Sequence, residues 1–274
     1  MTSAAPRVTQ DVTVGSLLRG WRERRRISQL ELALRAESSA RHISFIETGR
    51  SRPSQEMVLR LAEHLEVPVR ERNSLLIAAG YAPVYTERPL HDPAMAALRD
   101  SLDRVLAAYE PSPALILDGS YDVVAANRGI QLLLRGTPEH LLRPPMNALR
   151  LSLHPEGLAP RILNLREWRA HLLDRLERQI ALRPTPSLRR LLEEVSAYPV
   201  PDDGQDGRQP APDAYAYALP LRLELGGRVL SFISTVTTFN TPMDVTVSEL
   251  AVETLLPADP ETATALQELA GGHI

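Results

Sequence analysis

The sequence contains no cysteine and no lysine among its 274 residues. Without cysteine, the chain can form neither disulfides nor thiolate metal sites and has no cysteine nucleophile, which favours a reducing compartment. All 31 basic residues are therefore arginine, a bias that we attribute to coding preference rather than to function.

Long apolar runs are also missing. No segment approaches the roughly 20 apolar residues that cross a bilayer. Residues 1–13, expected to be a flexible N-terminus, lack the apolar stretch of a secretory signal. We therefore expect a cytoplasmic protein with no membrane partner.

Motifs of catalysis and metal binding are absent too. The sequence has no H-E-x-x-H, no G-x-S-x-G and no P-loop, and its seven histidines show no ligand spacing. The acidic run at 202–207, with Asp213 following, is a distant match to a calcium-binding EF-hand loop, but its third position is glycine and no helices flank it. We expect no enzymatic activity, no metal and no cofactor.

The length allows two domains, each with its own core. The formal net charge of −3 hides an asymmetry between them. Residues 1–88 contain 14 arginines and 10 acidic residues, a balance of +4, whereas the remainder contains 17 and 24, a balance of −7. This modest basic excess supports DNA binding only together with a matching motif.

Polar caps and helically spaced apolar residues predict a compact all-α domain at 14–80. Five helices are expected, at 14–26, 28–35, 39–48, from Ser54 to about Pro68, and at 70–79. The second and third helices are joined by a tight turn. This helix-turn-helix arrangement can place its second helix in the major groove of DNA.

The third helix is the expected DNA-reading element. Ile43 and Ile46 face inward, so the polar and basic positions face outward. Arg41 can make a bidentate contact to guanine, and an exposed Phe45 suits a thymine methyl group. The alternative is a helical bundle used for protein contacts. The predicted DNA-binding residues are Gln29, Ser39, Ala40, Arg41, His42, Phe45, Arg50 and Arg52.

Glu47 lies among apolar neighbours near the end of this helix and needs a partner. Arg22, on the first helix, can supply it through a bidentate ion pair. We predict that the pair is structural and that loss of one partner costs more than loss of a surface pair.

The rest of the chain changes character. Residues 81–110 are expected to form a linker and a connecting helix, and 111–270 an α+β domain. This domain should contain an antiparallel sheet of about five strands, with its helices inserted between strands two and three. Strands are expected at 113–118, 121–127, 215–225, 228–239 and 246–256, and helices at 128–135, 161–182, 187–197 and 260–270.

Two stretches carry a family resemblance. SQLELA at 28–33 and ISFIETGRSRPS at 43–54 resemble the Xre (Cro/C1-type) helix-turn-helix family. The longer run at 42–85 is similar to MmyB-like regulators, in which this domain precedes a PAS-like ligand-binding domain. PALILDGSYDVVAAN at 113–127 and TFNTPMDVTVSEL at 238–250 resemble that domain. The resemblance implies a bacterial transcription regulator whose positions 29, 40, 41, 42 and 45 face double-stranded DNA.

The turn between the second and third helices departs from the family pattern. A glycine followed by an apolar residue is usual there, whereas this chain has Glu37 and Ser38. Glutamate at a positive φ is strained where glycine is not. We therefore do not carry base specificity over from the family.

The resemblance also implies that the C-terminal domain binds a small hydrophobic molecule, for example a fatty acid. Arg161, Arg166 or Arg169 could meet a carboxylate, although arginines on an amphipathic helix usually form its solvated face. We expect a homodimer. The alternative is a C-terminal domain that serves only dimerisation or protein docking. The candidate pocket residues, each also a plausible core residue, are Asn127, Trp168, Leu172, Phe232 and Ser234.

Overall fold

The computed structural model describes residues 13–183, 185–200 and 218–271. The chain divides into two compact units. One comprises the chain up to Arg88 together with Asn240–Ser248, and the other comprises Pro89–Phe239 and the chain from Glu249 onward. The N-terminal segment, the acidic run at 202–213 and the start of the strand expected from 215 lie outside the described residues.

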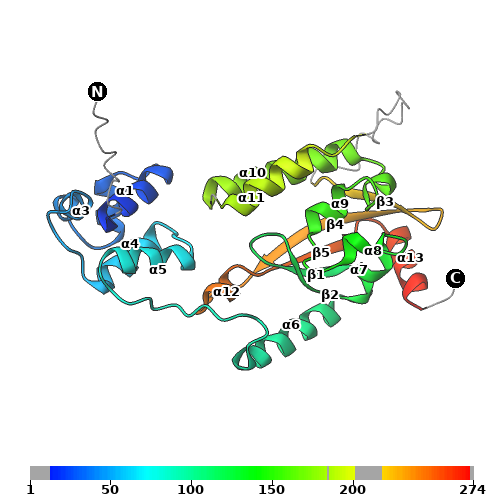
Figure 1. The fold of residues 1–274 in the computed structure, drawn as a ribbon, viewed down its shortest axis with the longest axis horizontal. Coiled ribbons are helices and arrows are strands. Elements are labelled where there is room, and N and C mark those ends of the chain that lie inside the picture. Colours follow the sequence, from blue (N-terminus) through cyan, green and yellow to red (C-terminus); the bar gives the residue numbers. More distant parts are fainter. Residues whose placement is uncertain (1–12, 184, 201–217, 272–274) are drawn as a thin grey trace, which may run out of the picture. The chain divides into compact units, whose positions relative to one another are not determined.

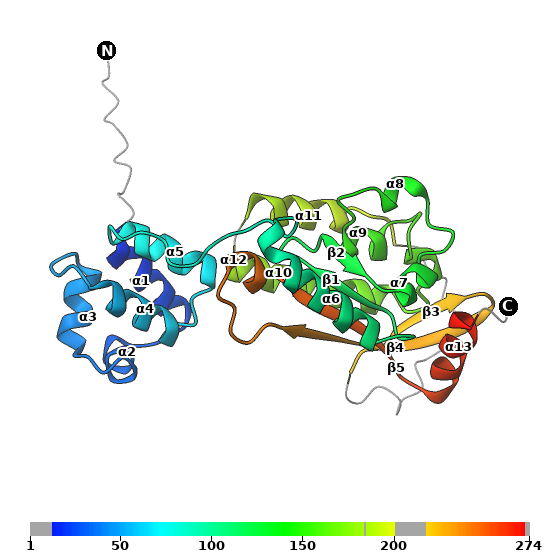
Figure 2. The same ribbon diagram turned by 90° about the horizontal axis from the view of Figure 1, so that it is seen from below.

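The first unit contains the five expected helices, all of which are labelled in Figure 2. Serine side chains cap α2, α3 and α4 as predicted, because each accepts a backbone N–H from the first turn. Gly49 and Gly80 follow α3 and α5 at φ values of 73° and 79°, which favour glycine. The five helices are α1 (Val14–Arg24), α2 (Gln29–Arg35), α3 (Ala40–Glu47), α4 (Gln55–His64) and α5 (Val69–Ala78).

The α2–α3 turn carries the strain expected from its sequence. Glu37 adopts a φ of 50°, in the left-handed region. The N–H of Ser38 donates to the carbonyl of Ala33 at 2.8 Å, so the turn is closed although its usual glycine is missing.

A buried ion pair joins α1 to α3. Arg22 donates through Nε and a terminal nitrogen to the two carboxylate oxygens of Glu47, at 2.6 and 2.9 Å. The Glu47 side chain is only 3% exposed, and its hydrogen bond raises the pKa of Arg22. Gly15 makes the close approach possible, because a Cβ there would lie 2.3 Å from the carbonyl oxygen of Ile46. The predicted structural ion pair between Arg22 and Glu47 is therefore present, and Gly15 lets the two helices approach each other closely.

The second unit is built on a five-stranded antiparallel sheet in the order β2-β1-β5-β4-β3. Gly226 and Gly227 both have positive φ and make the expected hairpin turn between β3 and β4. Most helices of this unit lie between β2 and β3 in sequence, as predicted, whereas one precedes β1 and another follows β5. The strands are β1 (Ala114–Leu117), β2 (Val123–Ala126), β3 (Leu221–Leu225), β4 (Arg228–Thr238) and β5 (Ala251–Pro257).

Helices cover both faces of this sheet (Figures 1 and 2). Leu115 and Leu117 of β1 join a large apolar core with α10 and α11. Ala114 and Ile116 alternate with them and join a smaller core with α6. The helices of this unit are α6 (Ala96–Ala108), α7 (Arg128–Leu133), α8 (Glu139–Leu142), α9 (Ala148–Leu153), α10 (Leu165–Leu182), α11 (Pro186–Ser196) and α13 (Pro260–Ala270), with short 3-10 turns at Pro93–Met95 and Ala159–Arg161.

The prediction of a strand from residue 246 was wrong at its start. Residues Val245–Ser248 form a helical turn, α12, and β5 begins only at Ala251. The reason is burial within the first unit, where Val245 is 1% exposed and α12 packs against α5. The N–H of Val245 donates to the carbonyl of Thr86 at 2.7 Å, and the Thr86 hydroxyl donates to Asp244, also at 2.7 Å.

Replacing Glu47 with alanine should lower the local stability of α1 and α3 by about 3 kcal/mol, because Arg22 keeps a buried charge without its partner. Amide hydrogen exchange in the two helices measures this loss. Glu31→Ala is the matched control, since Glu31 pairs with Arg35 on the exposed surface of α2 and such pairs contribute little. Equal effects of the two substitutions would contradict a structural role for the buried pair.

Replacing Glu37 with glycine should stabilise the α2–α3 turn by up to about 1 kcal/mol, since a left-handed conformation costs L-residues roughly 1–2 kcal/mol and glycine's unfolded-state entropy offsets part of the gain. The same exchange measurement applies. Glu37→Ala retains a Cβ and should bring no such gain. A gain of equal size from alanine would show that the φ of 50° is not the source of strain.

Candidate nucleic-acid interface and ligand cavity

The outward face of α3 is polar and basic. The Ser39 hydroxyl accepts the N–H of His42 at 3.1 Å and starts the helix, while Ile43 and Ile46 are buried. Arg41 is exposed, and its guanidinium lies 5.2 Å from the centre of the Phe45 ring. Phe45 was expected to be exposed but is half-buried, and stacking on its ring holds the Arg41 guanidinium on the helix surface.

Three of the other residues predicted to contact DNA differ in whether their side chains already have partners within the fold. Gln29 donates through Nε2 to Glu47 at 2.8 Å and so extends the buried ion pair. Arg52 donates through Nε to the carbonyl of Ala79 at 2.9 Å, at the C-terminal end of α5. Arg50 is exposed and forms no ion pair among the described residues.

Ala40 completes the predicted set. It is half-buried at the start of α3 and packs against the core of the first unit. Its small side chain leaves room for a binding partner to come close to that end of the helix. Arg41, Arg50 and Arg52 are the exposed arginines on and just after α3, and Arg52 is hydrogen-bonded to the carbonyls of Ala79 and Gly80.

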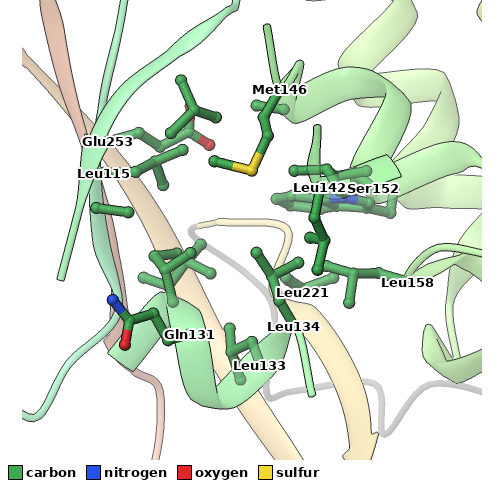
Figure 3. Close-up of a pocket in the computed structure, with 17 residues that line it drawn as sticks. Leu115, Gln131, Leu133, Leu134, Leu142, Met146, Ser152, Leu158, Leu221 and Glu253 are labelled. Carbon is green, nitrogen blue, oxygen red and sulfur yellow. Dashed lines mark hydrogen bonds between the residues drawn. The ribbon is translucent and has the colours of Figure 1, made fainter. Parts of the chain in front are cut away.

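The second unit contains a partly open cavity of about 430 Å³, within the range of small-ligand sites. Strands form one side, and residues of α8, α9 and the following loop form another (Figure 3). Fourteen of the 17 lining residues are apolar. The lining consists of Leu115, Val123, Ala126, Ile130, Gln131, Leu133, Leu134, Leu142, Met146, Ala148, Leu151, Ser152, Leu158, Trp168, Leu221, Glu253 and Leu255.

Two of the three polar residues in the lining, Ser152 and Glu253, form side-chain hydrogen bonds. The indole N–H of Trp168 donates to the Ser152 hydroxyl oxygen at 3.1 Å. Glu253 accepts from Arg175 at 2.9 Å and from the Ser234 hydroxyl at 3.1 Å. Gln131 is exposed and forms no side-chain hydrogen bond among the described residues.

Of the five pocket residues expected from sequence, Trp168 lines the cavity. Phe232 and Leu172 are buried in the core beside it. Asn127 is an N-cap, since its Oδ1 accepts the N–H groups of Ala114 and Ile130. Ser234 supports Glu253 rather than facing the cavity itself.

The three arginines considered as carboxylate partners are not among the lining residues. Arg161 donates to the carbonyls of Leu133 and Arg135, and burial lowers its pKa. Arg169 donates to the carbonyl of Ser196. Arg166 is exposed on α10. The cavity therefore lacks a basic group among the described residues that line it.

Two histidines and a glutamate that are separated in sequence come together at the surface. His140, His154 and Glu156 place one possible ligand atom each within 4.8 Å of the others. His154 Nδ1 accepts the backbone N–H of Glu156 at 3.0 Å, and His140 Nε2 lies 3.5 Å from the Glu156 carboxylate. The trio is thus already joined by interactions within the chain. Sequence spacing did not indicate it, because α8 and the end of α9 bring it together.

Two elements that contribute to the cavity were also missing from the sequence prediction. Helices α8 and α9 contribute Leu142, Ala148, Leu151 and Ser152. These helices span four and six residues, too few for a helical period to be distinguished from a loop. From Leu149 to Leu153 apolar and polar residues alternate, a pattern that indicates a strand, so the sequence carried no helical signal for α9.

Comparisons with known families agree with this two-unit structure. A family model of the MmyB-like transcription regulator ligand binding domain matches residues 98–269, and a helix-turn-helix family model matches residues 18–72. A search of curated proteins finds no match. None of the helices in the described part of the chain is both long and apolar enough to span a membrane. Because the first match covers more than half of the sequence, the chain belongs to the MmyB-like transcription regulators, which join a DNA-binding Xre-like helix-turn-helix domain to a ligand-binding domain.

Proposed function

We propose that this regulator reads a specific sequence of double-stranded DNA as a homodimer in the cytoplasm, and that a small hydrophobic ligand in the cavity controls its DNA affinity. The observation that carries the proposal is a mostly apolar cavity of about 430 Å³ in the family's ligand-binding domain. A fatty acid is one molecule whose chain suits such walls. The walls themselves do not decide its head group.

The exposed face of α3 supports sequence reading. Arg41 projects from the first turn of the helix, the part of a recognition helix that contacts base edges. Arg50 follows the helix end, where a guanidinium can contact a phosphate. A single domain of this size makes few contacts with DNA. Binding as two copies on adjacent half-sites supplies more contacts, so the small domain favours a homodimer.

The path of the chain supports control by the ligand. Glu253 and Leu255 of β5 line the cavity, and β5 begins at Ala251. Shortly before it, α12 ends at Ser248 within the unit that contains α3. A ligand that prefers one position of β5 can therefore bias the segment packed in the DNA-binding unit. Such differential affinity is what a ligand needs to change DNA binding.

Arg41→Ala should weaken binding to the specific site by about 1–3 kcal/mol and binding to random DNA much less, because it removes a base contact. Sequencing DNA that co-purifies with the protein identifies the site, and titrations at fixed salt then measure both affinities. Arg50→Ala is the control and should weaken both by similar amounts, as expected for a phosphate contact. Equal losses for Arg41→Ala would remove its base-reading role.

Filling the cavity should expel the ligand. Native mass spectrometry of the purified full-length chain is expected to show a retained small molecule, and Ala126→Leu should reduce its occupancy by adding volume to the cavity wall. Val124→Leu adds volume on the same strand at an exposed position and should leave occupancy unchanged. A wild-type protein that is repeatedly empty would instead favour a C-terminal domain used only for dimerisation or docking.

A further inference from the structure

Helix α8 has little of its own to hold it in place. None of its four residues is buried, and Pro138 at its N-cap forms no side-chain hydrogen bond. Yet Leu142, the last residue of α8, belongs to the cavity wall, on the same side as Ser152 and Leu158 (Figure 3). A further link between α8 and the segment that follows α9 would fix this side of the wall.

The side chains of His140, His154 and Glu156 are placed to provide such a link. His140 belongs to α8, whereas His154 and Glu156 lie directly after α9. One nitrogen or oxygen atom of each comes within 4.8 Å of those of the other two. Imidazole and carboxylate groups are ligands of zinc and related transition metals, and three protein ligands leave a fourth position for water.

The distance between two of these groups matches a tetrahedral metal site. Ligand atoms that lie about 2.1 Å from a zinc ion are roughly 3.4 Å from one another at the corners of a tetrahedron. His140 Nε2 lies 3.5 Å from a carboxylate oxygen of Glu156. Both side chains are more than half exposed, so they can rotate to close the remaining gap to His154.

The third ligand, His154, is held from behind. Its ring packs edge-to-face on Tyr198, with 5.1 Å between the ring centres. The Tyr198 hydroxyl donates to Glu194 at 2.7 Å, and Glu194 is itself paired with Arg150 of α9. Packing that fixes one ligand before the metal arrives lowers the cost of assembling the site.

Metal binding competes with one hydrogen bond inside the trio. His154 Nδ1 accepts the backbone N–H of Glu156 at 3.0 Å. This bond is lost whichever ring nitrogen binds the metal, because the ion either takes the Nδ1 lone pair or leaves the ring proton on Nδ1. A neutral hydrogen bond has a modest net value, and metal coordination by several side chains contributes more.

We propose that His140, His154 and Glu156 bind a divalent transition metal of the zinc class, and that the ion ties α8 to the segment after α9. The inference goes beyond the proposed function, because the metal site requires neither DNA nor a molecule in the cavity. The bound ion stiffens the side of the cavity that contains Leu142.

A zinc titration tests the site. Full-length protein without a histidine tag is stripped of metal with a chelator, dialysed and titrated with zinc chloride by calorimetry. One zinc ion should bind per chain, and X-ray absorption of the loaded protein should show two imidazole ligands. Magnesium should not compete, since it prefers oxygen ligands. The absence of saturable zinc binding, or a spectrum without imidazole ligands, would overturn the proposal.

His140→Gln should lower the zinc affinity at least about tenfold, because removing even a residue that supports a metal ligand costs about 10–100-fold. His91→Gln is the matched control, since it removes another exposed histidine of the same unit that lies outside the trio. It should leave the affinity unchanged. Zinc that binds His140→Gln as tightly as the wild type would be adventitious, and the site would be overturned.

Amide hydrogen exchange tests the link between the two segments. Zinc should slow the exchange of the α8 amides in the wild-type chain and should leave it unchanged in His140→Gln. If that variant does not fold, Glu156→Gln gives the same comparison, because it keeps the shape of the side chain and removes the charged ligand. Zinc bound by the trio without slower exchange in α8 would overturn the link.

Discussion

The burial of strand β1 on both of its faces is the constraint on which the C-terminal unit depends. Ala114 and Ile116 pack in the core formed with α6. Leu115 and Leu117 pack in the core formed with α10 and α11. Since buried backbone groups must be hydrogen-bonded, β1 needs a partner on each edge. It takes β2 from its own hairpin and β5 from near the end of the chain. The helices between β2 and β3 must then fold back over the sheet, and the cavity forms on the Leu115 side.

The two units use polar groups in opposite ways. On α3, charged side chains face solvent, and the buried Arg22–Glu47 pair only holds the helix in place. In the C-terminal unit, the paired carboxylate of Glu253 lies at the wall of an apolar space. The first arrangement suits a highly charged, hydrated polymer. The second suits a molecule that leaves water, because a few fixed polar groups in an apolar lining orient a ligand without supplying most of its affinity.

Local signals in the sequence were sufficient to predict most of the fold. The serine caps, the Arg22–Glu47 pair and the Gly226-Gly227 turn follow from residue chemistry over short distances or from an unpaired buried charge. The failures come from long-range packing. The strand expected at 246 is a helical turn because Val245 is buried against another part of the chain. Among the candidate site residues, Gln29 and Arg52 have partners within the fold that their spacing did not indicate. Four of the 17 residues that line the cavity come from α8 and α9, which are too short to show a readable helical period.

The packing of Val245 has a consequence for how this protein could be divided or recombined. Residues 240–248 separate two strands of the C-terminal sheet, yet they complete the helical unit. A fragment cut after Arg88 would lack the side chain that fills this apolar site and the partner of Thr86. The border between the two modules is therefore not one point in the sequence. An exchange of helical domains between relatives would have to transfer the β4–β5 loop as well.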